Sequence, residues 1–389
     1  MKAFNYYQPT EIIYGVDRIE ELGQFARRYG KKCLLVTTPP IPVLQPLFER
    51  AKKILIDAQI EVFHFDQIQP NPTTDNIAEG ARIAIENKVD FVVGLGGGSS
   101  MDSAKAIAVE ATHEGSCWDY LYFRESQPTE KTLPVIAIST TSGTGSQVTQ
   151  VAVVTNPKER NKSALYHSNL FPKIAIVDPK LMLTLPEHVT ASTGFDAFCH
   201  AFESTLHPNS SSYVDTLAYK AIQIIVETLP ALLKDLTNLE LRSKMALADT
   251  FAGLCIANAG VTLPHGVGMA ISGLYPHVMH GESLAIIYPS FSRFTYKSAI
   301  PQFATVGRIF NPELNNVSDE EAAQKACEEI DSFIKNIGMW MSLKDANMPE
   351  EEIPLLAKAS MVLPDYKANP RVATDAEMLE LIKESYYRE

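Results

Sequence analysis

The sequence lacks the features on which several classes of protein depend. Its 389 residues carry a formal net charge of -12 and no cluster of lysine or arginine, so nothing in it suits the backbone of a nucleic acid. No run of about 20 apolar residues occurs, which argues against a membrane-spanning helix. We therefore expect neither nucleic acid nor a membrane as a partner.

Cysteine is scarce and scattered. The five cysteines stand singly, and none has the Cys-x-x-Cys spacing of a thiolate zinc site. An odd number of isolated thiols is typical of a reducing compartment. The opening residues, MKAFNYYQPTEII, also lack the apolar centre of a secretory signal. Together these features indicate a cytoplasmic protein.

What the first half does contain is a regular alternation of apolar strands and amphipathic helices. Strand-like segments such as KKCLLVTT and IEVFHF are separated by segments with helical spacing. This alternation predicts an α/β fold with a mostly parallel, nucleotide-binding sheet covered by helices. After Leu185 the pattern is helical to the end. We expect an α/β dinucleotide-binding domain over 1–185 and an all-helical domain over 186–389.

Two turns rich in small residues follow strands of the expected sheet. In GLGGGSS (94–100), the backbone N–H groups and the N-terminus of the next helix suit a phosphate. The dinucleotide fingerprint G-x-G-x-x-G is incomplete because Ser99 takes the third glycine position, and a tight structural turn would explain this segment equally well. STTSGTGSQVT (139–149) supplies further hydroxyl and N–H groups. Two such turns in one sheet favour a bound nucleotide.

Aspartate and histidine form a candidate metal site in the second half. Asp196 and His200 are four residues apart, so on a helix they share one face. His265, His277 and His280 follow close together. One carboxylate with two or three imidazoles suits Fe²⁺ or Zn²⁺. Taken alone, Asp196 and His200 could form a helix-surface ion pair, or His200 could be a capped core histidine. The three later histidines could be ordinary loop residues.

In combination these motifs resemble the iron-containing (group III) alcohol dehydrogenase family, whose members include lactaldehyde and 1,3-propanediol reductases and butanol dehydrogenases. The matching segments, in order, are GGGSSMDSAK, TTSGTGSQVT, GFDAFCHAFE and the two His-Gly pairs. The resemblance covers nearly the whole chain. It implies an α/β domain followed by an all-helical metal-binding domain, with the active site in the cleft between them.

The resemblance also implies roles for individual residues. The metal ligands would be Asp196, His200, His265 and His280. His280 is preferred to His277 because the last ligand of the family is normally followed by glycine. Thr38, which follows the first strand of the sheet, is expected to bind the cofactor. The other residues expected to bind it belong to the two turns or follow them: Gly96, Gly97, Gly98, Ser99, Asp102, Thr140, Thr141, Thr144, Thr149 and Lys162.

Two departures from the family pattern bear on the chemistry. Many members carry a second histidine in H-G-x-x-H as a proton relay, but here Gly268 and Met269 occupy that stretch, which leaves His277 as a candidate relay. Members that prefer NAD carry an aspartate after the first strand, where this chain has Thr38 and its neighbours. Loss of that carboxylate favours NADP over NAD.

The expected function is hydride transfer between NADP or NAD and a small primary alcohol or aldehyde. Fe²⁺, or Zn²⁺, would polarise the substrate oxygen. Val151 and Met269 are candidate residues of the substrate pocket. The alternatives are a transhydrogenase acting between a hydroxy acid and an oxo acid, the zinc-dependent glycerol dehydrogenase branch, and a non-catalytic nucleotide- or metal-binding relative. The resemblance further implies a homodimer or a higher homo-oligomer.

Overall fold

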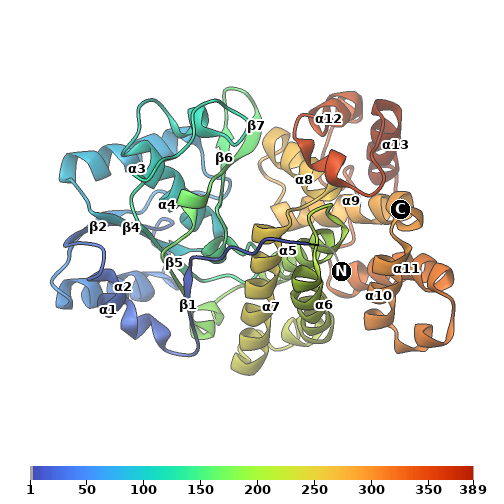
Figure 1. Ribbon diagram of the computed structural model, residues 1–389, viewed down its shortest axis with the longest axis horizontal. Helices are drawn as coiled ribbons and strands as arrows, with labels where there is room; N and C mark the ends of the chain where they lie inside the picture. Colours follow the sequence, from blue (N-terminus) through green and yellow to red (C-terminus); the bar gives the residue numbers. More distant parts are fainter. Residues whose placement is uncertain (1–2, 389) are drawn as a thin grey trace. The chain divides into compact units, whose positions relative to one another are not determined.

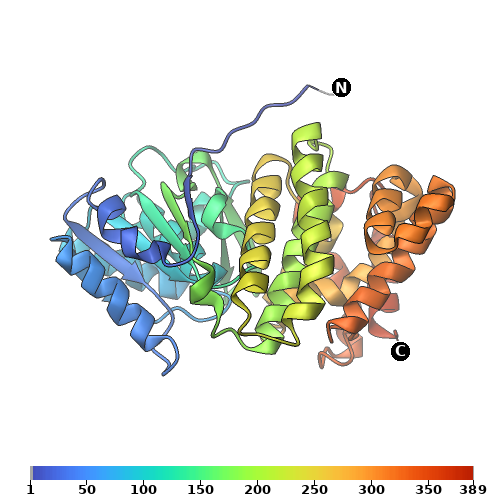
Figure 2. The same ribbon diagram turned by 90° about the horizontal axis from the view of Figure 1, so that it is seen from below.

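The chain folds into two compact units, and the computed structural model describes residues 3–388 (Figures 1 and 2). The sheet unit contains residues 8–185 and 237–246. Among the described residues, the helical unit contains 3–7, 186–236 and 247–388. Within the sheet unit, the guanidinium of the buried Arg242 donates to the carbonyl oxygen of Leu185, which attaches the segment 237–246 to the end of this unit.

A six-stranded sheet forms the centre of the sheet unit. Its strands lie in the order β1-β8-β5-β4-β2-β3, and every pairing is parallel. The inner strands are nearly continuous apolar runs because both faces of the sheet are covered. The predicted α/β fold with a parallel sheet is confirmed. The strands are β1 (Glu11–Tyr14), β2 (Lys32–Val36), β3 (Glu61–Phe65), β4 (Phe91–Gly96), β5 (Val135–Ser139) and β8 (Ile174–Val177).

Helices cover both faces of this sheet (Figure 1). One apolar core lies under α1 and α2, and a second core under α3 and α4. The strands β6 and β7 form a separate antiparallel hairpin. Since the six strands of the sheet are parallel, the turns that follow β2, β4 and β5 meet at one edge. The elements are α1 (Leu22–Ala26), α2 (Gln45–Asp57), α3 (Thr74–Asn87), α4 (Gly98–Glu110), β6 (Val151–Asn156) and β7 (Asn161–Tyr166).

The helical unit is built around α5 (Glu187–Leu206), whose side chains are almost all buried from Thr190 to Leu206. Phe195 and Phe198 stack on each other and contact the ring of Tyr288. α5 and α6 lie side by side (Figure 2). The predicted helical second half is confirmed. The other helices are α6 (Ser212–Leu232), α7 (Leu239–Asn258), α8 (Leu263–Leu274), α9 (His280–Thr295), α10 (Ile300–Phe310), α11 (Asp319–Asn336), α12 (Ile353–Ala359) and α13 (Asp375–Tyr386).

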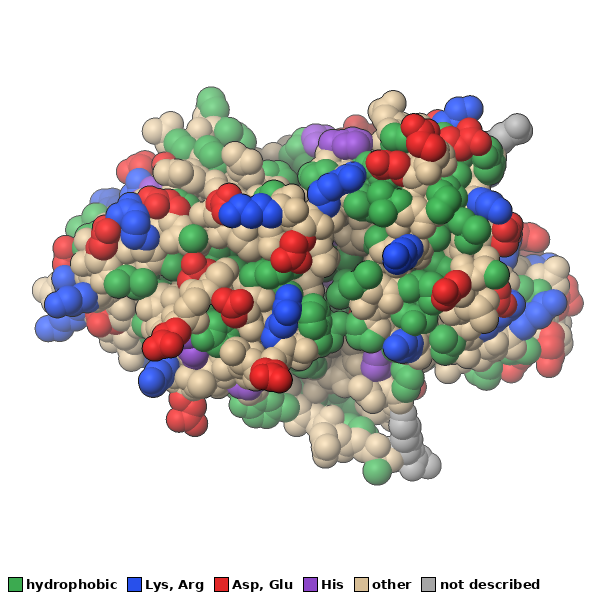
Figure 3. Space-filling view, turned by 90° about the horizontal axis from the view of Figure 1, so that it is seen from above, with side chains coloured by type: hydrophobic (Ala, Val, Ile, Leu, Met, Phe, Trp, Pro, Cys, Tyr) green, Lys and Arg blue, Asp and Glu red, His purple; other side chains and the backbone are tan. Residues whose placement is uncertain are grey.

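The surface carries charges of both signs. On the face drawn in Figure 3, acidic and basic side chains are interspersed with apolar ones. Among residues 3–388, no single helix combines the length and apolar composition needed to cross a membrane. Only α7 and α8, bent by 101° where they join, meet that test as a pair.

Candidate metal centre and cofactor turns

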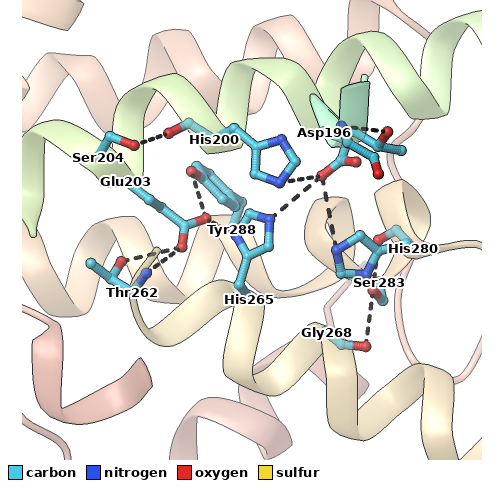
Figure 4. Close-up of polar contacts among 12 residues, drawn as sticks. Asp196, His200, Glu203, Ser204, Thr262, His265, Gly268, His280, Ser283 and Tyr288 are labelled. Carbon is cyan, nitrogen blue, oxygen red and sulfur yellow. Dashed lines mark hydrogen bonds and ion pairs between the residues drawn. The ribbon is translucent and has the colours of Figure 1, made fainter. Parts of the chain in front are cut away.

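The four predicted metal ligands come from three helices of the helical unit. Asp196 and His200 lie one turn apart on α5, His265 lies in the first turn of α8, and His280 begins α9. Their side chains surround Oδ1 of Asp196 (Figure 4). This oxygen lies 3.5 Å from Nε2 of both His200 and His265. It lies 3.9 Å from Nε2 of His280.

The spacing and the atom types of this cluster fit a divalent ion. The ligand atoms of Asp196, His265 and His280 all lie within 4.8 Å of one another. Two ligands that are each about 2.1 Å from a tetrahedral ion lie about 3.4 Å apart, close to the separations seen here. Oδ1 of Asp196 and Nε2 of His265 are buried and make no hydrogen bond. Burying such atoms is costly unless a ligand occupies them.

A buried carboxylate behind His265 fixes the orientation of its ring. Oε1 of the fully buried Glu203 lies 2.8 Å from Nδ1 of His265. Oε2 accepts a hydrogen bond of 2.8 Å from the backbone N–H of Thr262, and the Tyr288 hydroxyl donates to Oε1 at 3.3 Å (Figure 4). Because Glu203 holds the proton on Nδ1, Nε2 of His265 could offer its lone pair to a metal ion.

Glu203 was not predicted from the sequence, although a signal for it exists. It follows His200 by three residues on α5, so it lies close to the same face of that helix. It also belongs to the segment GFDAFCHAFE that carries the family resemblance. A glutamate on a helix whose side chains are almost all buried needs a buried partner.

The charges of the cluster balance one another. Burial alone would raise the pKa of Asp196, but His200, His265 and His280 outweigh it and lower that pKa to about 2. Burial alone would lower the pKa of His265, but Glu203 and Asp196 raise it to about 10. A proton on His265 therefore offsets part of the negative charge of Asp196 and Glu203. A bound divalent ion would take the place of that proton.

His277 lies outside this cluster. Its side chain is exposed, and its Nε2 is 2.9 Å from the carbonyl oxygen of Ala346. Met269, one turn after His265 on α8, is buried. Val151 belongs to the sheet unit, where it begins β6 and is partly buried.

A second carboxyl group that was not predicted, Asp365, lies beside the first turn of α8. A Cβ placed on Gly266 would lie 3.3 Å from the Cβ of Asp365. Burial raises the pKa of Asp365 to about 6, and His265 partly opposes that rise. Nothing in the sequence around Asp365 pointed to this position, because the residue lies a hundred positions after His265 and only the fold brings the two near each other.

The two small-residue turns of the sheet unit lie against each other. α4 begins at Gly98 immediately after β4, and β5 is the strand next to β4. A Cβ on Gly98 would lie 2.6 Å from Cγ2 of Thr144, and a Cβ on Gly97 would lie 3.1 Å from Cγ2 of Thr141. Glycine is required at Gly98 because the second turn occupies the space of a side chain.

This pair of turns fits a phosphate-bearing ligand. Gly96 has a φ of +152°, which side chains rarely tolerate, and its carbonyl oxygen accepts a 2.9 Å hydrogen bond from the N–H of Thr140. Ser99 lies in the first turn of α4, where N–H groups have no partner within the helix. Oγ1 of Thr141 is buried without a hydrogen-bond partner. An unused hydroxyl beside a helix N-terminus is a suitable place for an anion.

Two further predicted cofactor residues hold the unit together. The carboxylate of Asp102 accepts hydrogen bonds from the Ser146 hydroxyl at 2.6 Å and from the backbone N–H of Val153 at 3.0 Å. The ammonium of Lys162 donates to Oδ1 of Asn71 at 2.8 Å. Asp102 therefore links α4 to the second turn and to β6.

Comparison with known proteins identifies relatives along the whole chain. Residues 9–179 match the family described as iron-containing alcohol dehydrogenase, and residues 190–386 match the C-terminal part of the Fe-containing alcohol dehydrogenase family. The chain is 31% identical to the NAD-dependent methanol dehydrogenase of Bacillus methanolicus over 379 residues, 97% of this chain and 99% of the relative. It is 30% identical to the 1,3-propanediol dehydrogenase of Klebsiella pneumoniae over 387 residues, 99% of each chain.

A solved structure extends this similarity to three dimensions. An archaeal halo-thermophilic alcohol dehydrogenase from a Red Sea brine pool superimposes with a TM-score of 0.94 at 33% identity. The match covers 99% of this chain and 100% of that one.

The first prediction concerns the choice between His280 and His277. Replacing His280 with alanine removes one of four ligands, so the affinity for Zn²⁺ or Co²⁺ should fall by about 100-fold or more. His277→Ala is the matched control and should bind metal like the parent protein, because His277 lies outside the cluster. Metal per chain after loading and desalting measures both. Loss of metal in His277→Ala with retention in His280→Ala would refute the proposed ligand set.

The second prediction concerns Glu203. Glu203→Gln keeps the size of the side chain but weakens its hold on the Nδ1 proton of His265, so metal affinity should fall about 10- to 100-fold. Glu282→Gln is the control, because Glu282 accepts a hydrogen bond from the N–H of Met279 at the start of α9 and does not contact His265. Competition titration with a chromogenic chelator measures both affinities. Equal affinities in the two variants would show that Glu203 does not orient the ligand.

Proposed function

Because the chain belongs to the iron-containing alcohol dehydrogenase family, we propose that Asp196, His200, His265 and His280 hold the metal ion of this enzyme. The protein is a metal-dependent oxidoreductase that transfers hydride between a nicotinamide cofactor and a small alcohol or aldehyde. The observation that carries the proposed ligand set is the gathering of three imidazoles around one buried carboxylate oxygen. These nitrogen and oxygen donors suit Fe²⁺ and also accept Zn²⁺.

The residues of the chain prepare the site for this chemistry. When bound, a divalent ion supplies Lewis acidity toward the substrate oxygen and the nicotinamide gives or takes the hydride. Asp196 would contribute a negative charge to the ion, and Glu203 would keep Nε2 of His265 available to it. The turns around Gly98 and Thr144 would hold the cofactor phosphates. We propose that Val151 and Met269 each contact the substrate.

The proton of the alcohol needs a path to solvent. The family's usual relay position is occupied by Met269, whose thioether has no proton to exchange. We propose His277 as the relay, since its imidazole is exposed and an imidazole can both take up and release a proton. Under this proposal His277→Ala keeps its metal but turns over more slowly, whereas a relay made of water alone leaves the rate unchanged.

For the cofactor we propose NAD(H) rather than NADP(H). The expectation of NADP rested on a missing carboxylate after β2, and the comparisons give it no support, since the methanol dehydrogenase relative is NAD-dependent. Thr38 is partly buried at this position. The Thr37 hydroxyl is already engaged by the carbonyl oxygen of Thr38 at 2.8 Å and by Nε2 of His64 at 2.9 Å. A threonine hydroxyl can bond a ribose diol but brings no charge to hold a 2′-phosphate.

We also propose that the enzyme works in the cytoplasm as a homodimer or larger homo-oligomer. All five cysteines are buried thiols, which suits a reducing compartment. Phe4, Tyr6 and Tyr7 expose about half of their surface near the N-terminus, as expected for residues that a second copy covers.

The third prediction tests the proposed function directly. Protein loaded with Fe²⁺ or Zn²⁺ should oxidise NADH when given short aldehydes such as propanal or butanal, and NADPH should give a lower kcat/KM. Treatment with a chelator should remove most of this activity, because the proposed mechanism takes its Lewis acid from the bound ion. Absorbance at 340 nm records the rate, and added metal should restore it.

Two outcomes would contradict the proposal. Full aldehyde reduction by metal-free protein would rule out the metal-dependent mechanism. Turnover that requires an oxo acid and no free cofactor would identify a transhydrogenase in its place. A preference for NADPH would overturn only the choice of cofactor.

A further inference from the structure

Lys105 is a fully buried lysine in the middle of α4, and its charge is not used by the proposed reaction. Its ammonium is surrounded by oxygen atoms of one loop. The carbonyl oxygens of Ser146 and Val151 lie 2.7 Å from Nζ, and that of Thr149 lies 2.9 Å away. The hydroxyls of Ser146 and Thr149 lie at 2.9 and 3.4 Å.

These five oxygen atoms form a neutral cage around a positive charge. Oδ1 of Asp102 is 4.0 Å from Nζ, so this ion pair is long and the five neutral oxygen atoms make the closer contacts with the ammonium. Burial lowers the pKa of Lys105 to about 8 and Asp102 partly opposes this, so the group remains charged at neutral pH. A buried charge is stable only when hydrogen-bonded, and here backbone carbonyl groups provide most of the bonds.

The loop around the ammonium is the one that completes the second cofactor turn. It includes the 3-10 helix η3 (Ser146–Val148) and Thr149, and it ends where β6 begins at Val151. Three carbonyl oxygens converge on one point, where their partial negative charges repel one another, and the ammonium offsets this repulsion. α4 therefore contacts both turns, the first through its N-terminus at Gly98 and the second through Lys105.

We propose that Lys105 is a positioning residue that acts as a tethered monovalent cation, shaping the loop Ser146–Val151 so that the second turn can close on the nicotinamide cofactor. The inference rests on the proposed cofactor site, and it adds Lys105 as the residue that keeps the loop of that site in shape. It follows that a small free cation, such as ammonium or methylammonium, can replace the side chain once the side chain has been shortened.

The test compares two substitutions of Lys105, one that fills the space of the side chain and one that leaves a cavity. Lys105→Met fills the cavity without a charge, and Lys105→Ala leaves a cavity that a small cation can enter. NADH binding is followed by the fluorescence of the nicotinamide. Both variants should raise the Kd for NADH about tenfold or more, as expected for losing charged hydrogen bonds. Ammonium or methylammonium chloride should recover part of the affinity of Lys105→Ala. It should not help Lys105→Met, and tetramethylammonium should help neither variant.

Controls separate this role from general damage to the fold. Lys53→Met removes an exposed lysine of the same unit and should leave the Kd for NADH unchanged. Zn²⁺ binding should be retained in every variant, because the proposed ligands belong to the helical unit. If the Lys105 variants do not fold, Ser146→Ala serves in their place. It removes one hydroxyl of the cage and should raise the Kd for NADH about three- to tenfold.

Each remaining outcome decides the question. Unchanged NADH binding in folded Lys105→Met would refute the positioning role. Weakened binding in folded Lys105→Ala that no small cation restores would refute the tethered-cation account. Failure of the parent protein to bind NADH would instead refute the proposed cofactor site, and the two failures are therefore distinguishable.

Discussion

The contact between Glu203 and His265 is the interaction on which the metal centre depends. A carboxylate with no exposed surface must have its oxygens satisfied, and Glu203 accepts bonds from Thr262, His265 and Tyr288. These partners link α5 to α8 and α9, the helices that carry the predicted ligands. Loss of the carboxylate would leave several buried donors without an acceptor. Glu203 therefore supports both the stability of the helical unit and the orientation of the predicted ligands.

The sheet unit also contains a buried charged side chain, but of the opposite sign. In the helical unit a negative group is buried among donors, and in the sheet unit the positive Lys105 is buried among acceptors. In both places a single charge sets the positions of two neighbouring segments. Gly98 adds a steric requirement, because Thr144 occupies the space in which its side chain would lie. The close approach of the two turns leaves little room for a side chain at Gly98, and under our proposal Lys105 holds the second turn in shape.

Much of this arrangement could be predicted from local patterns. Alternating apolar strands and helices indicated the parallel sheet, and the four-residue spacing of Asp196 and His200 placed both on one helix face. The family motifs then selected His265 and His280, and the fold brings these residues together around Asp196. Their role as ligands remains a prediction. The local patterns did not predict the buried charged residues that support the two sites. Glu203 and Lys105 belong to the motifs GFDAFCHAFE and GGGSSMDSAK, but the motifs do not show that these two charges are buried, because burial depends on segments far along the chain.

X-ray absorption at the metal K-edge of the Zn²⁺-loaded protein tests the central claim most directly. The account predicts a shell of nitrogen and oxygen atoms at about 2.0–2.2 Å with the multiple scattering of three imidazole rings. It predicts one fewer imidazole in His280→Ala if any metal remains bound. A sulfur neighbour at about 2.3 Å, or fewer than three imidazoles in the parent protein, would contradict the assignment of Asp196, His200, His265 and His280 as the metal site.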